Sequence, residues 1–217
     1  MNTEQARFNM VEQQIRTWDV LDDRVLDIIQ STPREAFVPA KYRSLAFADL
    51  EIPLGNGQIM MTPKIEGRML QALELRPEDN VLEIGTGSGY LTTCLAKMSG
   101  SVTSFEVSED LSSLAQELIS TQNINNVELI VADVFQSLDT LNNYDVIAVT
   151  GSSPSELTPL AQHLQTGGRM FSIIGNRPVM SAILTTCVTP NNYRHEKLFE
   201  TSLPPLIMPP REKEFLF

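Results

Sequence analysis

The stretch Val81–Tyr90, which reads Val-Leu-Glu-Ile-Gly-Thr-Gly-Ser-Gly-Tyr, constrains the fold more than any other part of this 217-residue chain. Residues 81–84 form a mainly apolar run that is typical of a buried strand. Three glycines follow at 85, 87 and 89, and an apolar pattern with helical spacing begins after them. Glycine lets the backbone turn sharply and approach a ligand closely. The stretch therefore predicts a strand that passes through a tight turn into a helix, with a ligand beside the turn.

The alternation of strand and helix continues along the chain. Helical faces lie between the apolar runs, which predicts an α/β, Rossmann-like fold with a mostly parallel sheet and helices on both sides. Two later runs, 179–188 and 193–202, flank a turn at 190–192 and predict a C-terminal antiparallel hairpin. The predicted parallel strands are 81–84, 102–105, 127–131, 144–149 and 169–174, and the helical faces are Leu91, Leu95 and Met98, then Leu111, Leu114, Ala115 and Leu118, then Leu157, Leu160, Ala161 and Leu164.

The N-terminal part predicts two helices before the sheet begins. Asp19 is a candidate cap for the second helix, which we expect to end at Pro33. Residues 33–63 read as a long irregular loop, and loops of this length in compact domains are usually functional. The expected helical faces are Phe8, Val11 and Ile15, then Leu21, Val25 and Ile28, and a third helix is expected over 64–73.

We expect one domain over residues 1–217. Its parts are the N-terminal helical segment with the covering loop (1–79), the Rossmann-like core (80–203) and a proline-rich tail (204–217).

Composition excludes several classes of protein. The formal net charge is −11 and the pI is about 4.6, which argues against binding nucleic acid or anionic membranes. No apolar run reaches the ~18 residues that span a bilayer. Cys94 and Cys187 read as buried free thiols, while His163 and His195 are isolated, so no metal site is predicted. Residues 1–16 are polar rather than a signal peptide, and we expect a cytoplasmic protein.

The spacing of the glycines distinguishes between cofactors. Dinucleotide-binding folds usually show G-x-G-x-x-G, whereas here the third glycine comes one residue early. An acid, Glu83, stands two residues before Gly85. This combination predicts an S-adenosylmethionine site and disfavours a nicotinamide cofactor. A tight turn that binds nothing is the structural alternative.

Polar residues follow the next strands where each one ends. Glu106 comes 21 residues after Gly85 and suits a ribose diol, because a carboxylate can accept two hydroxyl hydrogen bonds. Asp133 ends the third strand and could accept from an adenine amino group, and Thr150 with Gly151 ends the fourth. Either acid alone could simply cap a helix or make a turn. Together, at successive carboxyl ends, they predict a cofactor site.

Beyond these features, the sequence resembles the protein-L-isoaspartate O-methyltransferase family over most of its length. Besides Val81–Tyr90, the matching stretches are Thr32–Pro39, Ala46–Asp49, Ile52–Gln58, Met69, Val149-Thr150 and Gly167-Gly168.

The resemblance implies transfer of a methyl group from S-adenosylmethionine to the α-carboxyl of an isoaspartyl residue. The ester then cyclises to a succinimide, which allows repair. It also implies a protein or peptide substrate and a monomer. Together with the residues at the ends of the predicted strands, the resemblance implies these cofactor-binding residues: Gln58, Glu83, Gly85, Thr86, Gly87, Ser88, Gly89, Glu106, Val107, Asp133, Val134 and Thr150.

The sequence departs from the family after Gln58. There the family's serine, commonly assigned to the active site, is replaced by Met61, whose thioether cannot donate a hydrogen bond. Thr62 is a candidate substitute, and no catalytic residue is assigned. Val134, residues 151–153 and the tail also differ from the family. The expected substrate-binding residues are Ile59, Met60, Met61 and Thr62.

These departures leave alternatives to a repair methyltransferase. One is a diverged methyltransferase whose cofactor site is intact and whose acceptor differs. Another is a non-catalytic module that binds S-adenosylmethionine or a partner protein through the tail.

Overall fold

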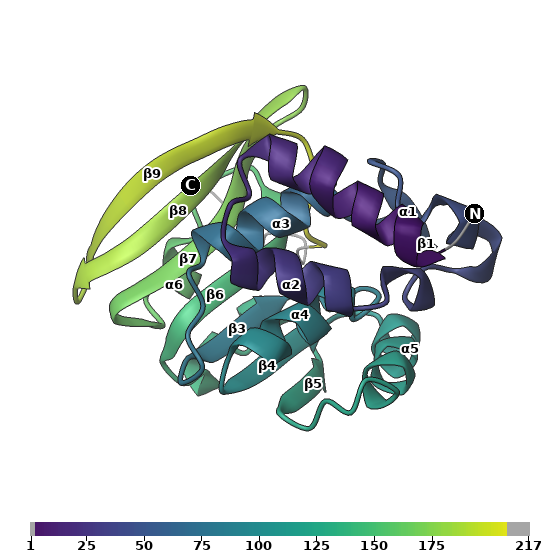
Figure 1. Ribbon diagram of the computed structural model, residues 1–217. Helices are drawn as coiled ribbons and strands as arrows, with labels where there is room; N and C mark the ends of the chain where they lie inside the picture. Colours follow the sequence, from purple (N-terminus) through teal and green to yellow (C-terminus); the bar gives the residue numbers. More distant parts are fainter. Residues whose placement is uncertain (1–2, 208–217) are drawn as a thin grey trace.

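The computed structural model describes residues 3–207, which form a seven-stranded sheet covered by helices (Figure 1). The strand order is β5-β4-β3-β6-β7-β8-β9. Strands β5 to β7 run parallel, and β8 and β9 add antiparallel to the end of the sheet, as predicted. The strands are β3 (Asn80–Ile84), β4 (Ser101–Glu106), β5 (Val127–Val131), β6 (Tyr144–Ser153), β7 (Leu164–Asn176), β8 (Val179–Thr189) and β9 (Asn192–Thr201).

The helices divide unequally between the two faces of the sheet. Helices α1 to α4 lie over one face, where they share the larger apolar core with α5 (Figure 1). The other face carries a smaller core with one short helix, α6. The helices are α1 (Thr3–Met10), α2 (Asp23–Ser31), α3 (Pro63–Ala72), α4 (Tyr90–Met98), α5 (Glu109–Ser120) and α6 (Thr158–Ala161). Because α4 and α5 directly follow β3 and β4, they start at the carboxyl edge of the sheet.

The segment 33–63 is more regular than expected. It contains a two-stranded hairpin, β1 (Ile52–Gly55) and β2 (Gln58–Met60), and two short 3-10 turns, Arg34–Ala36 and Ala40–Leu45. The hairpin turn is tight because Gly55, Asn56 and Gly57 all take positive φ values of 108°, 51° and 76°, which glycine and asparagine tolerate.

The N-terminal helices depart from their predicted faces. The chain leaves α1 through a π-helical turn, Val11–Ile15, and a 3-10 turn, Arg16–Trp18, which shift the helical phase. Phe8 is therefore 51% exposed, and Leu21 is 66% exposed because it precedes α2. The residues of α2 that are buried are Val25, Leu26 and Ile29.

Two predicted details of local structure were wrong. Asp22, not Asp19, caps α2, because its side chain accepts from the Arg24 N–H while Asp19 ends the preceding turn in a left-handed conformation. Leu164 begins β7 instead of continuing a helical face, since α6 lasts only four residues.

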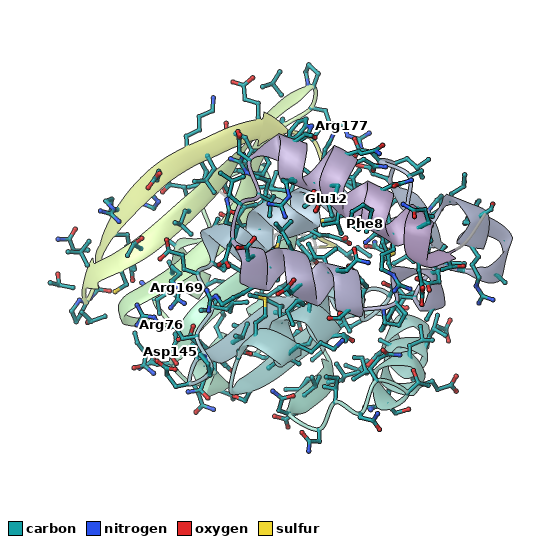
Figure 2. The ribbon with its side chains drawn as sticks, viewed as in Figure 1. Phe8, Glu12, Arg76, Asp145, Arg169 and Arg177 are labelled. Carbon is teal, nitrogen blue, oxygen red and sulfur yellow. The ribbon has the colours of Figure 1, made fainter. Side chains whose placement is uncertain are left out.

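A polar cluster fastens α3 to the sheet at the amino edge of the strands. Arg169 donates to the carbonyl oxygens of Leu73 and Glu74 at 2.5 and 2.6 Å and pairs with Asp79 at 2.6 Å. Figure 2 shows Arg169 close to Arg76 and Asp145, all at this end of the sheet. These contacts occupy the edge opposite the glycine turn and leave the carboxyl edge to the pocket described below.

Candidate cofactor and acceptor site

A pocket lies at the carboxyl edge of β3, β4, β5 and β6. Most of the sequence-predicted site residues line it: Gln58, Ile59, Met60, Met61, Gly85, Thr86, Gly87, Ser88, Glu106, Val107, Asp133, Val134 and Thr150. Glu83, Gly89 and Thr62 do not. Gly151, which follows Thr150 at the predicted strand end, lines the pocket as well. Further lining residues that the sequence did not indicate are Leu54, Glu66, Ile84, Leu91, Phe105, Ala132, Phe135 and residues 204–207.

The glycine turn is held between the two neighbouring strands. The N–H of Gly85 donates to the Phe105 carbonyl of β4 at 2.8 Å. The Thr150 hydroxyl of β6 donates to the carbonyls of Ile84 and Gly85, both at 2.8 Å. Gly85 has φ +96°, and a Cβ there would clash with the Thr150 hydroxyl oxygen. The sequence therefore needs glycine at this position for both its conformation and its close contact.

Glu83 lies beneath the turn rather than in the pocket. Its side chain is fully buried and accepts hydrogen bonds from the hydroxyls of Thr92 and Ser104, both at 2.6 Å. Ser104 in turn contacts the Thr86 hydroxyl at 2.6 Å. Burial, assisted by the negative charge of Glu106, raises the pKa of Glu83 to about 7 against these hydrogen bonds. This acid joins β3, β4 and α4 below the turn.

Glu106 bridges the glycine turn and the start of α5. Its two carboxylate oxygens accept from the N–H groups of Gly87 at 2.9 Å and Ser108 at 3.0 Å. The side chain of Ser108, not that of Glu106, caps α5 by accepting from the Leu111 N–H. Each carboxylate oxygen has a second lone pair, so Glu106 can also accept from a ligand in the pocket.

Asp133 stands at the next strand end. It accepts from the Phe135 N–H at 2.9 Å and from the Gln136 side chain at 3.2 Å, and so makes the turn that follows β5. It also lines the pocket, so the turn and the ligand site share this residue. Successive acids at the ends of β4 and β5 are therefore brought together as the sequence predicted.

The wall opposite the glycine turn is apolar. Ile59, Met60 and Met61 line the pocket, and Met61 is 5% exposed. Thr62 lies outside it; among the described residues, no group hydrogen-bonds its buried hydroxyl oxygen. A hydroxyl on this wall would thus require the loop to shift at Thr62.

The first residues of the tail close the pocket on the β6 side. The Leu206 N–H donates to the Ser152 carbonyl at 2.9 Å, and the Ser152 N–H donates to the Pro204 carbonyl at 3.0 Å. The Leu206 side chain covers Gly151, where a Cβ would come within 2.8 Å of it. The part of the tail beyond residue 207, where we placed a docking role, lies outside the described residues.

A buried ion pair that the sequence reading missed stands behind the apolar wall. Arg34, which is fully buried, pairs with Glu66 of α3. Its other N–H groups donate to the carbonyls of Ala46 at 2.9 Å and Met61 at 2.6 Å, and its guanidinium stacks on the Tyr90 ring at 4.9 Å. One signal was available: Glu66 shares a helical face with the apolar residues three and four positions later, Met69 and Leu70.

Burial dominates the titration of Glu66. It raises the pKa of this carboxyl to about 7, although the charge and hydrogen bond of Arg34 pull it down.

Other classes of site find no support in the part of the chain that the structure describes. Within residues 3–207, no three His, Cys, Asp or Glu side chains are grouped so that they could hold a metal ion. The same residues include no helix long and apolar enough to cross a membrane.

Comparisons with known proteins identify the family. The family model described as protein-L-isoaspartate (D-aspartate) O-methyltransferase matches residues 5–192. The chain belongs to this family. A protein-L-isoaspartate O-methyltransferase from Methanoculleus marisnigri is 39% identical over 171 residues, which cover 79% of this chain and 78% of that protein. Its counterpart from Roseiflexus castenholzii is 37% identical over 188 residues, covering 87% and 86%.

A solved structure has the same fold. It is a Plasmodium falciparum chain described as a protein-L-isoaspartate O-methyltransferase in complex with S-adenosyl-L-homocysteine. The TM-score is 0.80 at 20% identity, and the match covers 92% of this chain and 97% of that one. The family and the Rossmann-like methyltransferase fold, both predicted from the sequence, are thus confirmed.

Proposed function

We propose that this chain is an S-adenosylmethionine-dependent O-methyltransferase that methylates the α-carboxyl group of L-isoaspartyl residues for protein repair. The observation that carries the proposal is the pocket itself, in a chain of this family. It joins the glycine turn at 85–89, Glu106 and Asp133 to the loop Ile59–Met61. A cofactor wall and an acceptor wall therefore border one space.

The residues present fit the cofactor. The glycine turn exposes backbone to the pocket, Glu106 retains lone pairs for ribose hydroxyls, and Asp133 does so for an adenine amino group. The remaining proposed cofactor residues are Gln58, Thr86, Ser88, Val107, Val134 and Thr150, with Glu83 and Gly89 supporting the turn. When bound, S-adenosylmethionine supplies a methyl group carried on a positively charged sulfur.

The chain's own contribution to the reaction is positioning. An acceptor carboxylate is already ionised at neutral pH, so no general base is needed. The apolar wall Ile59–Met61 and the segment 204–207 exclude water from the pocket and hold the acceptor beside the glycine turn. Met61 cannot donate to that carboxylate, so backbone N–H groups that border the pocket take this task.

We also propose a single-domain monomer that acts on proteins or peptides in the cytoplasm and binds no nucleic acid. The net charge of −11 supports the lack of nucleic-acid binding, since phosphate contacts require a basic face. Cys94 and Cys187 are buried free thiols, which suits a reducing compartment.

The test is methyl transfer from labelled S-adenosylmethionine to a synthetic isoaspartyl peptide, with the matching aspartyl peptide as control. We expect label on the isoaspartyl peptide alone, in a base-labile ester. Equal labelling of both peptides, or labelling of neither by a chain that binds the cofactor, would refute the proposed acceptor.

A further inference from the structure

Glu66 is a buried acid that faces the pocket and has no task in the function proposed above. It projects from α3 and is 3% exposed. Carboxylates are rarely buried this fully unless they are paired, and Arg34 supplies the pair. A purely structural pair, however, does not need to line a ligand pocket, as Glu66 does.

The two oxygens of the Glu66 carboxylate are used differently. Oε2 accepts from the Arg34 guanidinium. Within residues 3–207, Oε1 has no hydrogen-bond partner, yet it is not among the fully buried side-chain atoms that lack one, so it keeps accessible surface where Glu66 lines the pocket. A carboxylate oxygen that is open to the pocket can accept from a ligand without breaking a contact inside the protein. Arg34 meanwhile fixes the orientation of the carboxylate, because it is itself held by the carbonyls of Ala46 and Met61.

The order of the strands places Glu66 at one end of the ligand. Asp133 and Glu106 end β5 and β4, which are neighbours on one side of β3. When the nucleoside of the cofactor contacts these two acids, the rest of the ligand extends past the glycine turn that follows β3. Glu66 lies beyond that turn. It pairs with Arg34, and the Arg34 guanidinium stacks on Tyr90 at the start of α4. The part of S-adenosylmethionine opposite the adenine is its amino-acid end, which carries an α-ammonium group.

The other acid near the turn is not available for this ammonium group. Glu83, which the sequence offered as a cofactor residue, does not line the pocket. Its Oε2 accepts from Thr92 and Ser104, and its Oε1 is enclosed below the turn with no partner among the described residues. Among the residues that line the pocket, the acids are Glu66, Glu106 and Asp133. With Glu106 and Asp133 assigned to the nucleoside, Glu66 is the acid left for a cation.

We propose that Glu66 binds the α-ammonium group of the cofactor through Oε1 while Arg34 holds Oε2. The proposal rests on the proposed use of S-adenosylmethionine, and it makes Glu66 a determinant of affinity for the amino-acid end of that ligand. A carboxylate between two cations is favourable in a buried site, because each charge-assisted hydrogen bond is stronger there than in water.

The test is isothermal titration at pH 8 with three probes. S-adenosylhomocysteine carries the ammonium and the carboxylate, its decarboxylated analogue carries the ammonium alone, and 5′-methylthioadenosine carries neither. For Glu66→Gln we expect the affinity for the first two probes to fall about ten- to a hundredfold, as for loss of one hydrogen bond between charged groups. The affinity for 5′-methylthioadenosine should change less than about threefold.

Glu106→Gln is the matched control, because all three probes share the ribose and should lose affinity together. An equal loss on all probes in Glu66→Gln, or no loss on any, would overturn the proposal. If Glu66→Gln does not fold, the pair replacement Arg34→Met with Glu66→Met removes the carboxylate without leaving a buried cation, and the same selectivity is expected of it.

These outcomes are separable from those of the proposed function. The unmodified chain could bind S-adenosylhomocysteine and Glu66→Gln show the expected selectivity, while no isoaspartyl peptide is methylated. That result would retain the role of Glu66 and refute the proposed acceptor. No binding of any probe by the unmodified chain would refute both.

Discussion

The glycine turn and the loop that faces the same pocket are held in place by different means. The turn at 85–89 is fixed on both sides by the parallel sheet, through Phe105 of β4 and Thr150 of β6. The loop around Met61 belongs to no large sheet. The buried side chain of Arg34 ties it to α3 and α4, and the Thr62 carbonyl accepts from N–H groups in the first turn of α3. The glycine turn is thus held by the large sheet, whereas the loop around Met61 is held by a buried ion pair, by the start of α3 and by core packing. Met61, one of the positions where the sequence departs from its family, stands in this loop.

The largest expected effect concerns the turn. Gly85→Ala places a Cβ against the Thr150 hydroxyl at φ +96°, so the turn must distort. We expect affinity for S-adenosylhomocysteine to fall more than about a hundredfold, which corresponds to roughly 3 kcal/mol. Gly57→Ala in the hairpin is the control: its φ is +76°, but nothing lies within 4 Å of the added Cβ. Equal losses in isothermal titration would mean that backbone strain alone, not the contact with β6, matters.

The second effect concerns the loop's anchor. Arg34→Met leaves Glu66 and the Met61 carbonyl buried without their donor, which we expect to cost about 3–5 kcal/mol of unfolding free energy. For a chain of this size the melting temperature should fall by roughly 10 °C. Arg24→Met removes a mostly exposed arginine that pairs with Asp22 and should cost less than about 1 kcal/mol. Similar thermal unfolding curves for both variants would contradict the role given to Arg34.

The third effect concerns the acceptor wall itself. Met61→Ser restores a hydroxyl where the family has one, and we expect the KM for an isoaspartyl peptide to fall about tenfold. Affinity for S-adenosylhomocysteine should stay within about threefold, since the change is on the other wall. Steady-state kinetics at saturating cofactor measure the first quantity. An unchanged KM would indicate that the pocket differs from the family at more than this residue.

The fourth effect is a dependence of stability on pH beneath the turn. The pKa of Glu83 is raised by burial to about 7, so the folded state retains a proton that the unfolded state has lost above its ordinary pKa of 4.5. The contribution of Glu83 to the free energy of unfolding is therefore fully present below about pH 4.5. It declines as the pH rises to 7, with a slope of at most about 1.4 kcal/mol per pH unit.

Glu83→Gln should remove this group's share of the slope, because glutamine does not titrate, while the share of Glu66, whose pKa burial also raises to about 7, remains. The groups that contact or influence Glu83 are Thr92, Ser104 and Glu106. Denaturant unfolding at pH 5.5 and pH 8 measures the difference between the two proteins. A slope unchanged by the substitution would assign it to other carboxyls.

Much of the cofactor wall could be predicted from the sequence, because its residues follow strands. Glycine spacing and the acids after β4 and β5 are local signals, and parallel topology brings strand ends together without further information. The strand at 127–131 and the hairpin after β7 were predicted for the same reason. The position of Glu83 was less predictable: strand alternation does not tell whether a residue at a strand end faces the ligand or the core beneath it.

The acceptor wall was harder to predict, because its contacts join segments far apart in sequence. Arg34 and Glu66 are 32 residues apart, and no periodic pattern links a loop arginine to a helix glutamate. The hairpin at 52–60 was missed because its strands are only four and three residues long. The π-helical turn at Val11–Ile15 similarly shifted the phase of the N-terminal helix, which a constant 3.6-residue period could not anticipate.

The central claim is that the pocket at the carboxyl edge of the sheet is a site for S-adenosylmethionine rather than for a dinucleotide. Isothermal titration of the unmodified chain with S-adenosylhomocysteine, and separately with NAD, tests it most directly. The account predicts one S-adenosylhomocysteine bound per chain and no measurable heat with NAD. Binding of NAD at comparable affinity, or no binding of S-adenosylhomocysteine, would contradict it.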